Sequence, residues 1–289
     1  MWIRADCSIR NKMARIGAKD YLKVEGLTKT FSSNSVKEKG FQGSFRVLDN
    51  VNFSCKAGEF ITLVGPNGCG KTTIFRIIAG LEDQEYGRIT VGGKPSYEAK
   101  IGYIFQNYRE SLYPWRTCFD NLLVPLELNK IPRRERKKRV EQFLFNLDFK
   151  VQDDAYPYQL SGGQQQLLCI LRALLYEPDV LLMDEPFSSL DFQTTLYMHD
   201  KVLEIWEKAK ATILFISHDI NEAVYLADKV VVLSKRPAHV MDVIEVDLPR
   251  PRKLEMSESE EFFAVRNRVL DIFKDEIADS LIRMEMSGF

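Results

Sequence analysis

The stretch of sequence that decides the fold reads Gly65-Pro66-Asn67-Gly68-Cys69-Gly70-Lys71-Thr72, which fits the pattern G-x-x-x-x-G-K-[ST]. It follows a short apolar run, residues 60–64, and precedes a helical pattern over residues 71–79, with Gly80 as the first residue beyond the helix. Glycines let successive backbone N–H groups converge on phosphate oxygens, and a helix that starts there directs its positive end at the same anion. The sequence therefore predicts a strand, a phosphate-binding loop and a helix in succession.

Two side chains of this stretch add chemistry that the backbone lacks. Lys71 supplies a cation for the β- and γ-phosphates of a nucleotide, and the Thr72 hydroxyl is suited to bind Mg²⁺. The alternative is a Gly-rich turn that caps an ordinary helix. The apolar run directly before the loop disfavours that alternative.

Further short apolar runs, at residues 101–105, 180–183, 212–216 and 230–233, alternate with helical patterns. This alternation predicts an α/β fold around a largely parallel sheet. Helical patterns dominate between residues 107 and 177, which we expect to form an inserted helical subdomain. Its run of cations at 133–139 is more typical of a solvated helix face than of a partner-binding patch.

Two carboxylates follow the run at 180–183. Asp184 is expected to hold Mg²⁺, directly or through water, and Glu185 to polarise the attacking water as a general base. An Asp-Glu pair after a strand is more often the start of a loop. Because this pair follows a phosphate loop in the same chain, the functional interpretation is favoured.

Two further strand-end residues are candidates for the same site. Gln106 ends the run at 101–105 and is expected to contact Mg²⁺ or the attacking water, although a solvated loop amide is the default alternative. His218 follows the run at 212–216 and is expected to sense the γ-phosphate or to stabilise charge in the transition state. A single histidine at a strand end is otherwise most often structural.

Composition sets the broad class. The chain has 289 residues, 45% of them hydrophobic, which suffices for a sizeable core, and a formal net charge of −1 disfavours a basic nucleic-acid binder. No run approaches the ~18 apolar residues of a membrane span. Five scattered cysteines form neither metal-ligand spacing nor a disulfide framework, which favours a reducing compartment. Residues 1–20 predict a disordered extension, or an upstream start with Met13 as the true one.

A second anion-binding helix start is predicted at Leu160-Ser161-Gly162-Gly163-Gln164. A serine and two glycines at a helix start permit close backbone approach to phosphate and present N–H groups. One chain then carries two half-sites for one triphosphate. This makes sense if two copies meet head to tail, each closing the nucleotide site of the other.

Together these motifs resemble the ABC ATPase cassette over about residues 21–245. In the family order they are the phosphate loop, Gln106, residues 160–164, Asp184 with Glu185, Ser189-Leu190-Asp191 and His218. The resemblance implies a RecA-like core, an inserted helical subdomain and an antiparallel β region near the N-terminus. It also implies ATP and Mg²⁺ as cofactors, hydrolysis of ATP to ADP and phosphate, and a homodimer that sandwiches ATP. It assigns nucleotide binding to the phosphate loop with Thr73, to Ser161, Gly162, Gly163 and Gln164, and to Asp191, with Thr72, Gln106 and Asp184 at the metal.

The resemblance further implies an aromatic ring that stacks on adenine. Phe31 is the candidate, but residues 32–46 look like an insertion, so Phe45 stays open as an alternative.

A finer resemblance points to the nitrate, sulfonate and taurine importer group. It is carried by residues 112–115, by 218–223 with 226–228, and by 248–252. It implies a subunit that powers uptake of a small anionic solute, peripheral on the cytoplasmic side of the membrane. Its partners would be a multi-span permease and, indirectly, a solute-binding protein, with no nucleic acid. Tyr113, Pro114 and Trp115 would contact the permease, or equally pack the subdomain onto the core.

Two other function classes compete with transport. A non-transport ABC ATPase acting on ribosomes or nucleic acid would usually carry two cassettes or a long coiled coil. A small-molecule kinase would have no reason for the second helix start at Ser161.

Two remaining features concern the helices. Leu167 stands where relatives usually carry arginine, which leaves the surface contacts of that helix open. After a linker at 249–252, Ser257 and Glu260 predict a capping box that opens an amphipathic helix, so that residues 246–289 form a C-terminal arm. We expect this helix to pack back onto the core.

Overall fold

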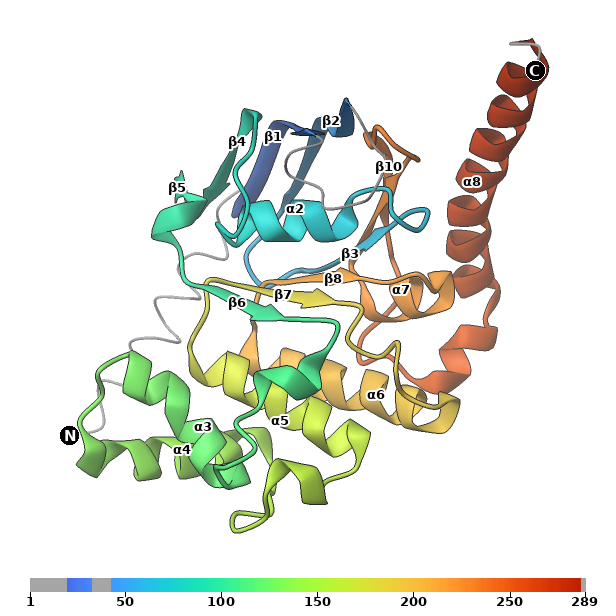
Figure 1. Ribbon diagram of the computed structural model, residues 1–289. Helices are drawn as coiled ribbons and strands as arrows, with labels where there is room; N and C mark the ends of the chain where they lie inside the picture. Colours follow the sequence, from blue (N-terminus) through green and yellow to red (C-terminus); the bar gives the residue numbers. More distant parts are fainter. Residues whose placement is uncertain (1–19, 33–42, 287–289) are drawn as a thin grey trace. The chain divides into compact units, whose positions relative to one another are not determined.

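The computed structural model describes residues 20–32 and 43–286, without the side chains of residues 108, 109 and 275–286 (Figure 1). The predicted extension at 1–20, apart from Asp20, and most of the predicted insertion at 32–46 lie outside the described residues. The chain divides into two compact units: unit 1 comprises the described residues up to Glu98 and from Ile216 onward, and unit 2 comprises residues 99–215.

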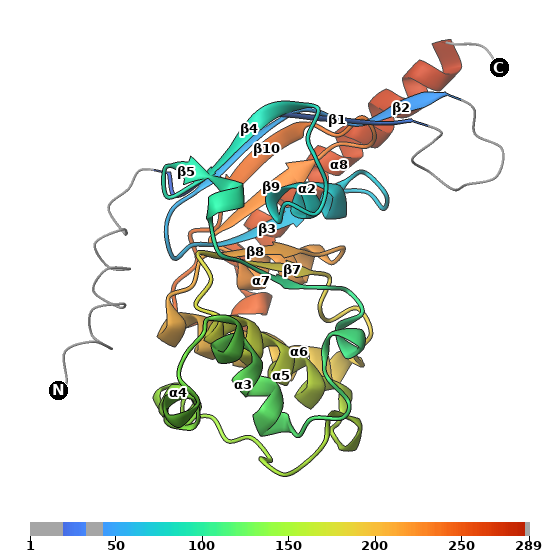
Figure 2. The same cartoon turned by 60° about the vertical axis from the view of Figure 1, so that its left-hand side comes forward.

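Unit 1 contains an antiparallel sheet in the order β2-β1-β4-β5, with a 3-10 turn, η1, directly after it (Figure 2). The elements are β1 (Leu22–Ser32), β2 (Ser44–Cys55), β4 (Tyr86–Val91), β5 (Lys94–Pro95) and η1 (Ser96–Glu98). β1 lies in the middle and pairs antiparallel with both β2 and β4. The predicted antiparallel β region near the N-terminus is confirmed.

Unit 1 also holds strands in the order β10-β9-β3, together with helices α2 (Lys71–Ile78) and α7 (Ile220–Leu226). These strands are β3 (Phe60–Val64), β9 (Lys229–Leu233) and β10 (Val240–Glu245). β3 and β9 pair in parallel and every residue of both is buried, as expected of strands covered on both faces. Helix α2 ends as predicted, because Gly80 has φ +69° and the Gly80 and Leu81 amides close the last turn.

The C-terminal arm belongs to unit 1 and consists of a 3-10 turn, η4 (Leu254–Glu258), and a long helix, α8 (Glu260–Met286). Helix α8 contacts α7 and β10 (Figure 1). Its Phe262 and Val269 side chains are fully buried. The predicted capping box is wrong: the Ser259 hydroxyl accepts the Phe262 amide, whereas Ser257 bonds to the Leu254 carbonyl. The intervening 3-10 turn takes up Ser257 and moves the helix start.

Arginines of the linker fasten the arm. The Arg250 guanidinium pairs with Asp228 at 2.8 Å, and that of Arg252 donates to the carbonyls of Val224 and Ala227 at the end of α7. Burial, followed by repulsion from Arg250, lowers the pKa of Arg252 to about 10. The linker therefore binds the last backbone carbonyls of α7, the helix that follows His218.

Unit 2 has strands in the order β8-β7-β6: β6 (Ile101–Ile104), β7 (Val180–Asp184) and β8 (Ile213–Ile216), whose last residue belongs to unit 1. Its helices are α3 (Cys118–Leu128), α4 (Arg133–Leu147), α5 (Gly162–Leu175) and α6 (Phe192–Ala209), with 3-10 turns η2 (Tyr108–Ser111) and η3 (Pro157–Gln159). β6 and β7 pair in parallel. Helix α3 contacts α4 and α5, and α6 contacts both α4 and α5 (Figure 2). All five predicted strands are present, and the α/β fold is confirmed.

The cationic run opens α4, where most of its side chains are exposed and several pair with acids of the same helix, as Lys137 does with Glu141. Among the helices of the described residues, none combines the length and the apolar character that a bilayer crossing requires.

Candidate functional site

The phosphate loop lies between β3 and α2, as predicted. Lys71 is only 5% exposed, and its ammonium donates to the carbonyls of Gly65 at 2.8 Å and Pro66 at 3.2 Å. The cation is therefore held against the loop by the loop itself. Cys69 is buried within this turn, whereas Asn67, Gly68 and Thr72 are exposed and Thr73 is half-buried.

Glycine is required in the loop for packing as well as for conformation. A Cβ on Gly70, whose φ is +125°, would lie 2.8 Å from side-chain carbons of Val47 and Leu48 on β2. A Cβ on Gly65 would lie 3.0 Å from the Leu233 carbonyl oxygen. Because Gly70 is also the N-cap of α2, no cap side chain competes with an anion for the first-turn N–H groups.

The two aromatic candidates for the adenine face each other across one strand pair. Phe31 on β1 is the Cα partner of Phe45 on β2, and their ring centroids are 6.1 Å apart. Both rings are half-buried, and a cation lies near each, Lys29 at 4.9 Å and Arg236 at 5.6 Å from the centroid. The two alternatives thus belong to one aromatic pair, and the choice between them stays a prediction.

His218, also in unit 1, is exposed in the connection between β8 and α7. The residues around it are tightly bonded: the Ser217 hydroxyl accepts the Asp219 amide at 2.9 Å and bonds to the Glu222 carboxylate, and the Ser217 amide donates to Leu63 of β3. Asp219 caps α7 by accepting the Asn221 amide at 2.7 Å. These bonds fix the backbone on which the His218 ring is carried.

In unit 2 the structure brings Gln106, Asp184 and Glu185 together at the carboxyl ends of β6 and β7, with Asp184 as the last residue of β7. Asp184 is 5% exposed and accepts the Tyr103 hydroxyl at 3.0 Å, and Glu185 accepts the Gln106 amide at 3.2 Å. Glu185 has φ +46°, a left-handed conformation that costs about 1–3 kcal/mol for a non-glycine residue. This turn sets the directions in which the adjacent carboxylates leave the strand.

Sequence reasoning missed Tyr103. A tyrosine inside an otherwise apolar parallel strand was the available signal, because a buried hydroxyl requires a hydrogen-bond partner. The register Tyr103↔Leu182 places it two residues before Asp184 on the neighbouring strand.

The predicted second helix start is the N-terminus of α5. Ser161 is its N-cap: its Oγ accepts the Gln164 amide at 3.3 Å, and Gln164 Oε1 accepts the Ser161 amide at 2.9 Å. Gly163 is buried, and a Cβ there would lie 2.8 Å from the Thr194 methyl carbon. Its lack of a side chain therefore lets α5 pack on α6, a requirement that differs from the predicted approach to phosphate.

Thr194 contacts residues of two predicted motifs, Asp191 and Gly163. Asp191 is the N-cap of α6, and its carboxylate accepts both the Thr194 amide at 3.0 Å and the Thr194 hydroxyl at 2.7 Å. These bonds lower the pKa of the exposed Asp191 carboxyl. The same Thr194 side chain fills the space beside Gly163. The starts of α5 and α6 consequently meet at this residue, which the sequence analysis did not single out.

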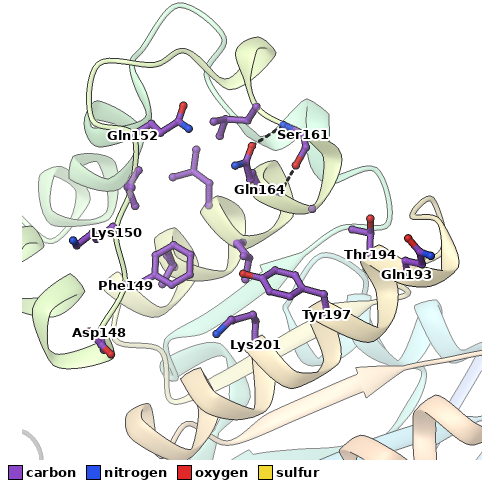
Figure 3. A pocket seen from close by; sticks show the side chains of 16 residues that line it. Asp148, Phe149, Lys150, Gln152, Ser161, Gln164, Gln193, Thr194, Tyr197 and Lys201 are labelled. Carbon is purple, nitrogen blue, oxygen red and sulfur yellow. Dashed lines mark hydrogen bonds between the residues drawn. The ribbon is translucent and has the colours of Figure 1, made fainter. Parts of the chain in front are cut away.

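A cavity of about 740 Å³ lies beside this junction, between residues 148–152, α5 and α6 (Figure 3). Its lining includes Ser161 and Gln164, Phe149 and Tyr197, and leucines of α5. Leu167 is 3% exposed and belongs to this apolar wall. Because it is buried, a leucine fits at this position, where relatives usually carry arginine.

The predicted permease-contacting residues lie on the segment before α3. The Tyr113 and Trp115 ring centroids are 5.4 Å apart, and Trp115 is 71% exposed. The buried Asn121 side chain accepts the Tyr113 amide at 2.9 Å and donates to the carbonyls of Tyr113, Arg116 and Thr117. The two aromatic rings are thus presented from a segment of fixed backbone.

The donor set predicted for Mg²⁺ fits that ion. Thr72, Gln106 and Asp184 offer hydroxyl, amide and carboxylate oxygens, which are hard donors. Within the described part of the chain no group of three or more His, Cys, Asp and Glu side chains gathers to cage a metal. Mg²⁺ that is bound through substrate phosphates needs only one or two protein ligands.

Comparison with known proteins places these motifs in a family. Residues 48–188 match the ABC transporter family. An uncharacterised ABC transporter ATP-binding protein of Methanocaldococcus jannaschii is 44% identical over 262 residues, which cover 90% of this chain and 94% of that protein. The aliphatic sulfonates import ATP-binding protein SsuB of Bacillus cereus is 38% identical over 255 residues, covering 87% and 95%.

Among solved structures, the chain is similar to the ATP-binding cassette MJ0796, a dimer in a post-hydrolysis state bound to ADP and Pi. The TM-score is 0.63 at 28% sequence identity, and the match covers 79% of this chain and 100% of the cassette. The relatives that are 44% and 38% identical align over nearly the whole chain. The protein therefore belongs to the ABC transporter ATP-binding family and is an ATPase of that family.

Proposed function

We propose that this ATPase powers a membrane importer for a small organic or inorganic anion, with aliphatic sulfonate as the first candidate, followed by taurine and nitrate. The observation that carries the proposal is the 38% identity to an aliphatic sulfonates import ATP-binding protein over 87% of the chain. Another such protein, from Bacillus licheniformis, is 40% identical over 88% of the chain.

The proposed cassette spans residues 21–245, with residues 107–177 as its helical subdomain and 246–289 as an appended arm. Residues 65–73 bind the triphosphate, with Lys71 at the β- and γ-phosphates. Phe31 or Phe45 stacks on the adenine. The burial of Lys71 against the loop carbonyls supports this role, because the cation is already desolvated and oriented.

Hydrolysis is proposed to proceed by attack of one water on the γ-phosphorus. The new bond joins the water oxygen to that phosphorus, the bond to the β–γ bridging oxygen breaks, and Glu185 accepts the proton. The hydrogen bond from Gln106 supports this role by orienting the carboxylate. His218 contacts the γ-phosphate and stabilises charge as it develops.

Mg²⁺ would be held by Thr72, Gln106 and Asp184, Asp184 acting directly or through water. When bound, this ion neutralises phosphate charge. The Tyr103 hydroxyl, which donates to Asp184 at 3.0 Å, keeps that carboxylate in one orientation.

The site is proposed to be completed by a second copy. The start of α5 in the second copy would contact the phosphates that the first copy binds, through Ser161, Gly162, Gly163 and Gln164. Asp191 of the second copy would lie at the same interface. A dimer with a two-fold axis would form two such sites. The MJ0796 cassette is dimeric in its post-hydrolysis state, which supports this arrangement.

The proposed partners are a multi-span permease and, indirectly, a solute-binding protein, with the ATPase peripheral on the cytoplasmic face of the membrane. Tyr113, Pro114 and Trp115 are the proposed permease contacts. The 71% exposure of Trp115 supports this, since large exposed aromatic side chains are enriched at protein interfaces.

Uptake by whole cells tests the proposal. Source cells that carry either the wild-type chain or Glu185→Gln in its place, as the matched control, are given labelled ethanesulfonate, taurine or nitrate. The proposal expects uptake of one of these anions in wild-type cells and background uptake with the variant. Equal uptake in both strains, together with ATP turnover that responds to ribosomes or nucleic acid, would favour a non-transport ABC ATPase.

A further inference from the structure

The connection between β9 and β10 is fastened to the strand that carries Phe45. The Ala238 amide donates to Val47 of β2 at 2.8 Å, and the Ala238 carbonyl accepts the Asp49 amide at 2.9 Å. The connection is closed on itself, because Ser234 and His239 exchange bonds of 3.0 Å. Residue 236 is therefore carried on a short loop with both ends fixed.

Two segments of unit 1, β2 and the end of β9 with the connection that follows it, pack against three glycines of the phosphate loop. Leu233, at the start of this connection, lies against Gly65, and Val47 and Leu48 lie against Gly70. The third contact is made by Arg236: a Cβ on Gly68 would lie 3.5 Å from its Nη2 and 3.9 Å from its Cζ. The guanidinium thus lies directly beside the exposed turn of the loop.

The same guanidinium lies by the aromatic pair. Arg236 Cζ is 5.6 Å from the Phe45 ring centroid, and that ring is 6.1 Å from Phe31. A guanidinium held near an aromatic face keeps its N–H edge for acceptors that it can bind through two hydrogen bonds, such as phosphate. Arg236 therefore bridges the space between the aromatic rings and the phosphate loop.

Arg236 also differs from the neighbouring cations in how its charge is paired. Lys29, which approaches the Phe31 ring, is paired with Glu82 at 2.7 Å, and Lys71 is bonded to loop carbonyls. Among the described side chains, those of residues 20–32, 43–107 and 110–274, no ion pair involves Arg236, whose side chain is exposed. An arginine oriented by neighbours without a carboxylate partner is suited to an anionic ligand.

We propose that Arg236 binds the α-phosphate of the nucleotide. The inference rests on the proposed roles of the phosphate loop and the aromatic pair. A nucleotide with its base at the rings and its β- and γ-phosphates at Lys71 has its α-phosphate between them, where the guanidinium lies. Arg236 is then a binding residue that serves ATP and ADP alike, because the α-phosphate is common to both.

Calorimetric titration of the full chain with ATP and with ADP tests this assignment. Arg236→Ala is expected to raise both dissociation constants by about tenfold, the loss typical of one charge-assisted hydrogen bond. Arg236→Lys keeps the charge without the fork and should fall between Ala and wild type. The KM for ATP should rise in the same direction as the dissociation constants, because the lost contact is to a phosphate of the bound nucleotide.

The matched control is Arg46→Ala. Arg46 adjoins Phe45 on β2 and is similarly exposed, but its guanidinium forms an ion pair with Asp49 at 3.0 Å. Nucleotide affinity should therefore not change in this variant. Wild-type affinity for both nucleotides in Arg236→Ala, with the melting temperature unchanged, would overturn the proposal. A loss confined to ATP would also overturn it, because that would place the arginine at the γ-phosphate.

Lys71→Ala separates this proposal from the one on which it rests. If Lys71→Ala abolishes ATP affinity while Arg236→Ala has no effect, the phosphate loop stands and the arginine assignment fails. If neither variant weakens ATP binding, both the arginine assignment and the proposed nucleotide site fail.

Discussion

The side-chain amide of Gln106 donates a hydrogen bond to the carboxylate of Glu185 over 3.2 Å. The donor stands just beyond β6 and the acceptor just beyond the parallel strand β7. The bond orients a carboxylate whose backbone is in the left-handed conformation. A strained backbone with an oriented side chain is a geometry often found at catalytic positions.

Replacement of Glu185 by Gln removes the proposed general base and keeps the side-chain size. We expect turnover to fall by at least about 100-fold, the lower end of what a positioned base contributes, with ATP affinity within about twofold of wild type. The variant should accumulate as an ATP-bound dimer. Phosphate release and light scattering after size exclusion measure the two effects. Wild-type turnover would show that the base lies elsewhere.

Tyr103→Phe tests the carboxylate beside it. The change removes the hydroxyl that donates to Asp184 at 3.0 Å and leaves a mostly buried carboxylate with one bond fewer, at a cost of about 1–3 kcal/mol in the free energy of unfolding. If Asp184 holds Mg²⁺, the Mg²⁺ concentration for half-maximal turnover should rise severalfold. Tyr97→Phe is the control, because Tyr97 is 80% exposed in the same chain. An unchanged Mg²⁺ requirement would separate Asp184 from the metal.

Ser161→Asp separates the two roles of the α5 N-cap. Aspartate caps helices as well as serine does, so the free energy of unfolding should change little, whereas Ser161→Ala should lose about 1 kcal/mol. The added negative charge would face phosphate bound by the second copy, so Ser161→Asp should abolish ATP-dependent dimerisation. Chemical denaturation and sedimentation measure the two effects. If Ser161→Asp dimerised with ATP as wild type does, this helix start would not contact phosphate.

The sequence predicted the features that depend on local chemistry. The strand ends near 64, 104 and 184 follow from continuous apolar runs, and the loop at 65–72 follows from its glycines and lysine. Contacts between distant segments could not be predicted from spacing. Tyr103 with Asp184, Thr194 with Gly163, and Arg236 with Gly68 each depend on strand register or helix packing. The cap of α8 was misplaced because a 3-10 turn and a helix start share one polar pattern.

The central claim is that the triphosphate needs the Lys71 loop of one copy and the Ser161 helix start of another. The measurement that tests it most directly is ATP turnover per chain as the purified protein is diluted through the dimer dissociation range, with sedimentation on the same samples. The account predicts that turnover per chain falls in step with the dimer fraction and vanishes in the monomer. Full turnover per chain in a sample that sediments only as monomer would contradict it.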